Sequence, residues 1–373
     1  MPDRKIVYGI CGIGRGHTIR QVPIVEHFAR QSRLVIFAYG ESHKFYSDRY
    51  RGHSSITVER VSVPFMAGDA NGLDFAASLR RHEQGGVDHF SVNCNAMARA
   101  QAILGRPDLV ISDYEPVCAQ YAYASDAPLV TIDQQSKYLV GDFPAVLGGQ
   151  TYVDEIARLR MFFPRAQARF ACSFFNVPRA AAGREVVDVC APVLKDSILS
   201  MKRTPAKGRQ SIVVYISSQR DFVQDLGEVA EICAKQKSCD FHFFVPADVA
   251  ARLEEKQAVS VYKHGDARFS SLLEQCSGLV TTGGHSLLSE AMHLGMPAYV
   301  IPLAVYEQHM NAHVIDRHGF GVSRPCVESQ ALAEFIEELP AFARAIESDK
   351  EVLLRGSGED HIIASLERQF FLR

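Results

Sequence analysis

The sequence contains no tryptophan, and none of its apolar runs approaches the roughly 20 residues that a membrane-spanning helix needs. It also has no long basic run, and 40 basic against 43 acidic side chains leave a net charge of −3. This balance argues against nucleic-acid binding. No charged segment followed by an apolar one precedes the first predicted strand, so we expect no signal peptide. Together these absences predict a cytoplasmic protein.

The cysteines do not form any recognisable pair. There are nine of them, none is part of a C-x-x-C motif, and most lie inside apolar runs. This pattern is typical of small buried side chains in a reducing compartment. The sequence also has no D-x-D triplet and no clustered set of histidine and aspartate residues. We therefore expect no metal site and no cofactor.

Short apolar runs alternate with longer amphipathic segments, and this rhythm predicts parallel sheets that are covered by helices. The chain of 373 residues is longer than one core usually serves, so we expect two domains. The polar, basic segment 195–209 interrupts the rhythm and is the predicted linker. The predicted domains are 1–194 and 210–355, followed by a last amphipathic helix within 356–373 that packs back on the first domain.

The predicted strands and helices follow from these runs. Strands are expected at 5–10, 34–39, 56–63, 109–112, 129–132, 169–174, 211–217, 240–246, 259–265, 278–283 and 297–302. Helices are expected at 18–30, 92–104, 222–235, 269–275, 286–294, 309–318 and 359–371.

A glycine-rich loop, GICGIGRGHTIR, follows the first predicted strand and places Gly12, Gly14 and Gly16 just before His17. It matches the G-x-G-x-x-G fingerprint of dinucleotide-binding proteins only in part. Glycines permit positive φ and let the backbone approach a ligand closely. We expect His17 at the start of the helix 18–30, where the helix dipole disfavours a charged imidazole and suits a general base. The alternative is a structural histidine that caps a turn.

A base histidine is usually oriented by a carboxylate at its other ring nitrogen. Asp113 ends the apolar run DLVISD, so it is expected at the carboxyl edge of the sheet, on the same side as His17. Its alternative role is the N-cap of a helix that begins near Pro116. Asp133, at the end of PLVTID, is a second candidate.

The second half carries the longest motif, TTGGHSLLSEAMHLGMPAYVIPLAVYEQHMNA, at 281–312. A strand ends before Gly283 and Gly284, and His285 and Ser286 then open a helix. The free backbone N–H groups and the dipole of such a helix end bind phosphate. One turn further, Glu290 is placed to accept hydrogen bonds from ribose hydroxyls.

The loop and helix after the next strand carry polar side chains suited to sugar hydroxyls, Glu307, Gln308 and Asn311. With them, the whole segment resembles the donor-binding signature of GT-B nucleotide-sugar glycosyltransferases. Glu307 and Gln308 match the acidic–Gln pair of that family, and Asn311 with Ala312 matches the Asn-Ala that follows it.

Two further features carry the resemblance. Gly284 and Ser286 fall in the phosphate-contacting turn of the signature, and GIGRGH resembles the glycine-rich loop of the enzyme that adds N-acetylglucosamine to lipid-linked muramyl peptide. His17 and Asp113 lie 96 residues apart, close to the separation of the His–Asp dyad in the UDP-glycosyltransferases. The resemblance covers essentially the whole chain in order.

The resemblance implies a GT-B fold, in which two Rossmann-like, doubly wound α/β domains face each other across a cleft. It implies an N-terminal acceptor-binding domain and a C-terminal nucleotide-sugar-binding domain. The implied reaction is an inverting, metal-independent transfer of a sugar from a UDP or dTDP donor to an acceptor hydroxyl. His17 would be the general base and Asp113 would orient it.

The resemblance also implies further donor contacts. Ser217, Ser218 and Gln219 would face the diphosphate, and His264, in the turn 262–266, would lie near the nucleotide base. Two departures from the family pattern stand out. The base-stacking tryptophan of the plant enzymes is missing, and the histidine that begins the plant signature is Thr282 here.

The acceptor has no signature in the sequence and can be a small molecule, a glycan or a lipid-linked sugar. Arg80, Arg81 and the apolar residues near Phe75 would supply a peripheral membrane contact if the acceptor is lipid-linked, but the favoured interpretation of the two arginines is solvated charge on a helix. Two alternatives share the implied fold. One is a nonhydrolysing UDP-sugar 2-epimerase, and the other is a catalytically silent protein that binds a nucleotide sugar.

Overall fold

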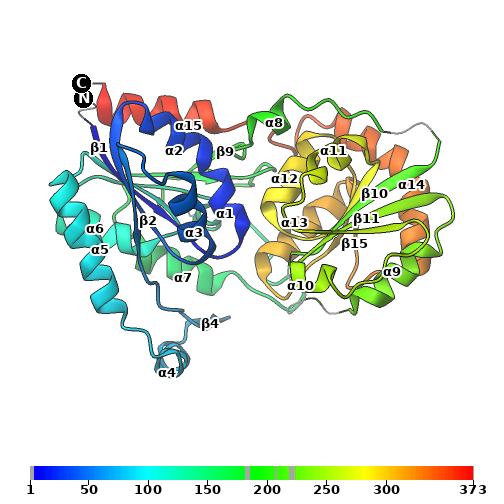
Figure 1. Ribbon diagram of the computed structural model, residues 1–373, viewed down its shortest axis with the longest axis horizontal. Coiled ribbons are helices and arrows are strands. Elements are labelled where there is room, and N and C mark those ends of the chain that lie inside the picture. The colour runs from blue at the N-terminus through cyan, green and yellow to red at the C-terminus, as the bar shows by residue number, and fades with distance from the viewer. Residues whose placement is uncertain (1–3, 181–184, 206–207, 218–221, 223, 373) are drawn as a thin grey trace.

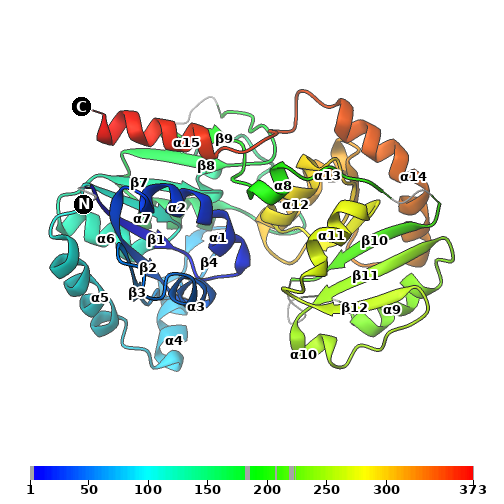
Figure 2. The ribbon, with the colours of Figure 1, turned by 45° about the horizontal axis from the view of Figure 1, so that its top comes forward.

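The computed structural model describes residues 4–180, 185–205, 208–217, 222 and 224–372, which form two lobes side by side (Figure 1). Each lobe holds one parallel β-sheet with helices on both faces, and Figure 2 shows the two sheets from a second direction. The alternation of apolar runs and amphipathic segments therefore predicted the architecture correctly.

The sheet of the first lobe has seven parallel strands in the order β3-β2-β1-β6-β7-β8-β9. The last of them has only three residues and was not predicted. The strands are β1 (Arg4–Ile10), β2 (Ser32–Ala38), β3 (Ile56–Arg60), β6 (Leu109–Asp113), β7 (Leu129–Asp133), β8 (Ala168–Cys172) and β9 (Asp188–Cys190).

Successive residues of β1 are buried against different helices, because strand side chains alternate between the two faces of a sheet. Tyr8 packs in one core with Phe28, while Val7 packs in the opposite core with Ala100. The helices of this lobe are α1 (Arg15–Arg20), α2 (Val22–Ala29), α3 (Gly40–Arg49), α4 (Phe75–Gly85), α5 (His89–Leu104), α6 (Pro116–Ala124), η1 (Gln135–Leu139) and α7 (Val153–Phe162). A small hairpin, β4 (Gly68–Asp69) with β5 (Gly72–Leu73), precedes α4.

The helix predicted at 18–30 is in fact two helices, α1 and α2, which meet at Gln21. Pro23 lies in the first turn of α2 and has no amide hydrogen, so it cannot continue the hydrogen bonds of α1. The first helix also begins earlier than predicted, at Arg15. His17 therefore lies inside the first turn of α1 rather than just before a helix.

The sheet of the second lobe has six parallel strands in the order β12-β11-β10-β13-β14-β15. They are β10 (Gln210–Tyr215), β11 (Cys239–Val245), β12 (Val259–Lys263), β13 (Gly278–Thr282), β14 (Ala298–Ile301) and the unpredicted β15 (Gly321–Ser323). The helices are α9 (Leu226–Ala234), α10 (Ala247–Ala250), α11 (Arg268–Gln275), α12 (His285–His293), α13 (Tyr306–Arg317) and α14 (Ser329–Ser348).

The longest of these helices, α14, was not predicted. It contains Pro340, a residue that usually ends or bends a helix. Its apolar face packs on the sheet, with Leu332, Phe335 and Leu339 in the core that also holds Tyr299. Burial of this face stabilises the helix in spite of the proline.

The segment predicted as a linker is anchored on the second lobe. It contains a short helix, α8 (Asp196–Leu199), and then Arg203. The guanidinium of Arg203 donates to the carbonyl oxygens of Gly295 at 2.7 Å and Cys276 at 2.8 Å. These bonds satisfy carbonyl groups near the ends of α12 and α11 and fix where the chain enters the second sheet.

The chain returns to the first lobe after α14, and its last helices, α15 (Glu359–Leu366) and η2 (Glu367–Phe371), lie along that lobe (Figure 2). Ile362 and Leu366 are buried in the same core as Phe28. Arg4 Nη1 donates to Glu367 Oε1 at 2.7 Å, so the two ends of the chain meet on this lobe.

An apolar cluster joins the two lobes. It contains Tyr138 and Phe143 of the first lobe together with Tyr306 and Met310 of the second. The Tyr306 hydroxyl also donates to the carbonyl oxygen of Pro144 at 2.5 Å. Because Tyr306 is the first residue of α13, this contact fixes the start of that helix against the first lobe.

Candidate active site between the two lobes

The glycine loop and Asp113 lie together at the carboxyl edge of the first sheet. The strands β1 and β6 are neighbours, and Ile10 pairs with Asp113. From β1 the sheet continues to β2 on one side, and from β6 it continues to β7 on the other. Ligands of doubly wound sheets bind at such a switch in strand order, beyond the carboxyl ends of the strands.

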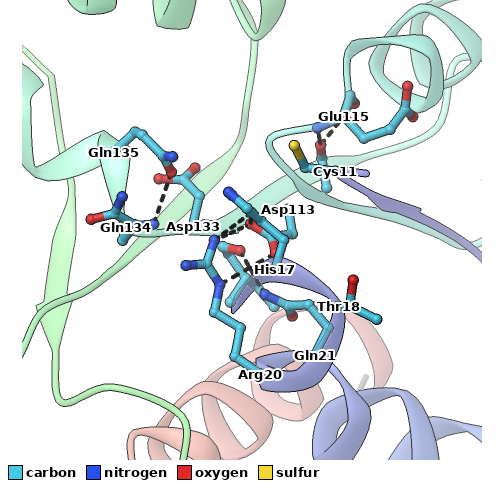
Figure 3. A network of polar contacts seen from close by, with 12 residues as sticks. Cys11, His17, Thr18, Arg20, Gln21, Asp113, Glu115, Asp133, Gln134 and Gln135 are labelled. Carbon is cyan, nitrogen blue, oxygen red and sulfur yellow. Dashed lines mark hydrogen bonds and ion pairs between the residues drawn. The ribbon is translucent and has the colours of Figure 1, made fainter. Parts of the chain in front are cut away.

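His17 and Asp113 form a hydrogen-bonded pair at this position (Figure 3). The His17 Nδ1 lies 2.9 Å from the Asp113 Oδ1. Burial would raise the pKa of the fully buried Asp113, but the charges of Arg20 and then His17 outweigh burial and lower it. The carboxylate is therefore ionised, and it faces the Nδ1 of the His17 ring.

Asp133, the second candidate partner of His17, binds elsewhere. Its carboxylate accepts from the Ser136 backbone N–H at 2.6 Å and from the Ser136 hydroxyl at 2.9 Å, so it holds the first turn of η1. Asp113 is also not the N-cap of α6. That role belongs to Glu115, which accepts from the N–H groups of Val117 and Cys118 at 2.8 and 2.7 Å.

Arg20 belongs to the same polar network and was missed in the sequence. Its Nη2 lies 2.5 Å from Asp113 Oδ1, and its Nε lies 3.3 Å from Asp113 Oδ2. The side chain is 8% exposed. The available signal was its position three residues after His17, which puts both side chains on one face of a helix.

The glycine loop reaches the second lobe. Gly14 has a φ of 73°, in the region that favours glycine, and it lies directly before α1. A Cβ on Gly16 would lie 2.6 Å from the Ser286 Oγ. The loop that carries His17 therefore touches the first turn of α12.

The N-terminus of α12 faces this contact and has no side-chain cap. Gly284 is the N-cap residue, and Ser286 follows in the first turn. His285 is 5% exposed, and its Nε2 has no hydrogen-bond partner among the described residues. Burial, and then the nearby charges of Lys137, Arg20 and His17, lower the pKa of His285 well below its usual value.

Gln308 and Asn311 hold the turn before α12. The Gln308 Oε1 accepts from the backbone N–H groups of Gly283 and Leu303, both at 3.0 Å. The Asn311 Nδ2 donates to the Gly283 carbonyl at 2.8 Å. The prediction assigned both side chains to a sugar, whereas the structure shows that they also build the turn.

The other residues predicted to bind the nucleotide sugar lie farther from one another. Ser217 lies at the end of β10, and its Oγ is 3.0 Å from the Thr282 Oγ1. The His264 ring stacks on Tyr215 with 4.7 Å between ring centroids. Glu290 lies one turn into α12, where burial raises its pKa and the charge of Lys195 opposes this. Ser218 and Gln219 lie outside the described residues.

Lys137 is a second polar residue that the sequence analysis missed. It follows β7 in η1, is fully buried, and donates from Nζ to the Gln134 Oε1 at 3.1 Å. Burial lowers its pKa to about 8, against the attraction of Glu307 on α13. Nothing in the sequence pattern around Lys137 indicates that this ammonium group is buried beside the second lobe.

The described residues contain no group of three or more His, Cys, Asp or Glu side chains that could hold a metal ion. Within the same part of the chain, no helix is long and apolar enough to cross a membrane.

Three solved structures that share this two-lobed fold are glycosyltransferases. A UDP-glucosyltransferase from Polygonum tinctorium superposes with a TM-score of 0.69 at 13% identity, covering 99% of each chain. The glycotransferase of kitacinnamycin gives a TM-score of 0.66 at 16% identity, covering 99% of this chain and all of the other. Glycosyltransferase VinC in complex with dTDP gives 0.62 at 16% identity, covering 98% of each chain. The predicted GT-B fold is thereby confirmed.

Sequence comparison gives the family. NDP-glycosyltransferase YjiC of Bacillus subtilis (strain 168) is 34% identical over 84 residues, which span 22% of this chain and only a fifth (20%) of that protein. The model of glycosyl transferase family 1 matches residues 4–340, most of the chain. The protein therefore belongs to glycosyl transferase family 1.

Proposed function

We propose that the protein is an inverting, metal-independent glycosyltransferase that moves a sugar from a nucleoside-diphosphate sugar to an acceptor hydroxyl. The observation that carries the proposal is the contact of His17 Nδ1 with Asp113 Oδ1, where His17 lies in the first turn of α1 and the neighbouring Gly16 touches the N-terminus of α12. A base and an anion-binding helix end thus meet at one place. Membership of glycosyl transferase family 1 supports the same reaction class.

The donor binds at the second lobe in this proposal. The N–H groups of the first turn of α12 and the hydroxyls of Ser286 and Ser217 face the diphosphate, and the helix dipole stabilises its charge. Glu290 binds the ribose hydroxyls, and His264 lies beside the base.

The sugar of the donor lies at the start of α13. Glu307 and the Asn311 Oδ1 accept from its hydroxyls, and the Gln308 Nε2 donates to them, because the turn uses the Gln308 Oε1 and the Asn311 Nδ2. The donor nucleotide is UDP or dTDP, the two that are named for the solved relatives from Polygonum tinctorium and for VinC. The nucleotide sugar is a substrate, and no cofactor takes part.

The transfer follows from these positions. Asp113 accepts a hydrogen bond from the His17 Nδ1–H, which keeps the ring proton on Nδ1 and leaves the lone pair of Nε2 for the acceptor hydroxyl. As Nε2 takes the hydroxyl proton, the acceptor oxygen attacks the anomeric carbon on the face opposite to the diphosphate. The bond from the anomeric carbon to the diphosphate oxygen breaks, and the configuration at this carbon inverts.

The acceptor binds on the first lobe in this proposal, beside the segment that carries α4. Phe75 and Leu79 of α4 are 63% and 57% exposed, and Arg80 and Arg81 lie next to them. This surface suits a peripheral contact with a lipid-linked acceptor, and a small molecule or a glycan uses the same lobe. The protein acts in the cytoplasm, where nucleotide sugars are available.

A thermal-shift screen against UDP, dTDP and GDP, with and without EDTA, tests the donor site. Ligand at 100 times its dissociation constant adds about 2.7 kcal/mol to the free energy of unfolding. We expect one nucleotide to stabilise the protein equally with and without EDTA, and Glu290→Ala to weaken this effect. His53→Ala, an exposed site, is the matched control.

Incubation of the stabilising nucleotide sugar with acceptors then separates the proposed activity from its alternatives. A transferase releases the nucleoside diphosphate and forms a glycoside. A 2-epimerase converts the donor sugar without an acceptor, and a silent protein binds the donor without any turnover. Absence of a shift with every nucleotide would contradict the donor site.

A further inference from the structure

Arg20 touches both members of the His17–Asp113 pair. Its Nη2 lies 2.5 Å from Asp113 Oδ1 and also 2.7 Å from His17 Nδ1, while its Nε lies 3.3 Å from Asp113 Oδ2. Figure 3 shows the guanidinium beside the carboxylate and the imidazole. All three groups are therefore parts of one network, in which Arg20 and Asp113 are buried and His17 is partly buried.

Two of these contacts involve the same nitrogen, His17 Nδ1, and they cannot both be hydrogen bonds at the same time. An arginine nitrogen can only donate, so the His17 Nδ1 either accepts from Arg20 or donates to Asp113. In the first arrangement Nε2 carries the ring proton and cannot take another from a substrate. In the second arrangement Nε2 has a free lone pair. The balance between Arg20 and Asp113 therefore decides whether His17 can act as a base.

The negative charge of the buried Asp113 must also be compensated by a nearby positive charge. Without Arg20, the fully buried Asp113 would face His17 alone, and a second proton on the imidazole would be the nearest compensation for its charge. A doubly protonated imidazole has no lone pair. With Arg20 bound to both carboxylate oxygens, the negative charge is already paired.

We propose that Arg20 is a positioning residue of the His17–Asp113 pair, which keeps His17 neutral by sharing the charge of Asp113. The proposal rests on the proposed role of His17 as general base. Arg20 would not touch the substrate itself and would act only through His17 and Asp113.

Other titratable and polar groups surround these three residues, among them Asp133 at the end of β7, whose pKa is raised by burial and also by the charge of Asp113. The Tyr114 ring, next to Asp113, has its centroid 6.5 Å from that of His17. From α3, the neutral hydroxyls of Ser42 and Tyr46 bind Thr18 of α1. Across the boundary lies His285, whose pKa is lowered by burial and then by the nearby charges of Lys137 and Arg20. The cation that faces the same group of residues from η1 is Lys137.

The pH dependence of kcat/KM with the donor from the thermal-shift screen tests the proposal. In Arg20→Gln we expect the acidic limb of the profile to move to higher pH by about one unit, because His17 then protonates more readily. Arg20→Lys keeps the charge but loses the two-point contact, so the acidic limb of its profile stays near that of the wild type while kcat falls.

Arg30→Gln, an exposed site at the end of α2, is the matched control. A uniform loss of activity in Arg20→Gln, with no movement of the limb, would overturn the proposal.

A second readout does not depend on turnover. Nitrogen-15 NMR of labelled histidine, with His17→Gln used to assign the His17 signals, reports the protons on both ring nitrogens. At neutral pH we expect a larger doubly protonated fraction in Arg20→Gln than in the wild type. In Arg20→Gln/Asp113→Asn, which removes both charges and also serves if the single variant fails to fold, this fraction returns toward the wild-type value. Equal protonation of His17 in all three proteins would contradict the role of Arg20, even if no acceptor is ever found. If His17 protonation changes as expected but no sugar is transferred, only the proposed function is contradicted.

Discussion

Gly16 of the first lobe meets Ser286 of the second, so closely that a Cβ on the glycine would lie 2.6 Å from the serine Oγ. The loop with the proposed base and the helix end with the proposed phosphate site are thus in direct contact. Glycine at this position keeps the two lobes at their observed distance.

Gly16→Ala is expected to lower kcat/KM about tenfold, because a shift of the loop by a fraction of an ångström misplaces His17 relative to the donor. The free energy of unfolding should not fall, since Gly16 lies within α1 and alanine favours a helix. Steady-state kinetics and urea unfolding measure the two effects. Ser286→Ala removes the hydroxyl that the new methyl group meets, so adding Gly16→Ala to Ser286→Ala should cost less activity than Gly16→Ala costs in the wild type. An equal cost in the two backgrounds would contradict this explanation.

His17→Ala should lower kcat by about 100- to 10,000-fold, the range that a general base contributes. The thermal shift caused by the nucleotide should remain, because the donor contacts lie on the second lobe. Initial rates at saturating donor, compared with those of His53→Ala, measure the effect. Transfer at the wild-type rate in His17→Ala would assign the base to another residue.

Asp113→Asn and Asp133→Asn form a matched pair, because both aspartates are buried at the ends of neighbouring strands. The amide in Asp113→Asn donates to His17 Nδ1 and so places the ring proton on Nε2, and we expect kcat to fall about 100-fold or more. In Asp133→Asn the side chain can still accept from the Ser136 N–H, and activity should stay within about threefold of the wild type. Equal losses in both variants would show that the fold of this edge, rather than the Asp113 contact, matters.

Glu115 gives the stability of the protein a dependence on pH. Burial raises the pKa of its carboxyl to about 7, against the N–H groups of Cys118 and Val117. In the unfolded chain the pKa is about 4.3, so between these values the folded state binds more protons and stability falls as pH rises. From pH 5 to pH 8 the free energy of unfolding of the wild type should fall by about 2 kcal/mol more than that of Glu115→Gln. Urea unfolding at the two pH values measures this difference, and equal slopes in the two proteins would contradict it.

The sequence predicted the fold well where apolar runs are long. The central strands of both sheets, such as β1 and β13, are buried on both faces and stand out as continuous apolar segments. The edge strands β9 and β15 have three residues each and carry no such signal. The helix α14 was missed because a proline inside a segment argues against a helix, although the segment has a regular apolar face.

The site could be predicted only in part, because its contacts cross between distant segments. His17, Asp113 and the turn before α12 were found by motif and position. Arg20 was missed because its partner, Asp113, lies 93 residues away and only the fold brings the two together. Lys137 was missed because charged residues are expected at the surface.

The stereochemistry of transfer tests the central claim most directly. Wild-type protein and His17→Ala are incubated with the stabilising nucleotide sugar and an acceptor, and proton NMR follows the anomeric signals of donor and product. We expect the wild type to form a glycoside with the anomeric configuration opposite to that of the donor, and His17→Ala to form almost none. A product that retains the donor configuration, or an equal rate in the two proteins, would contradict a single displacement with His17 as the base.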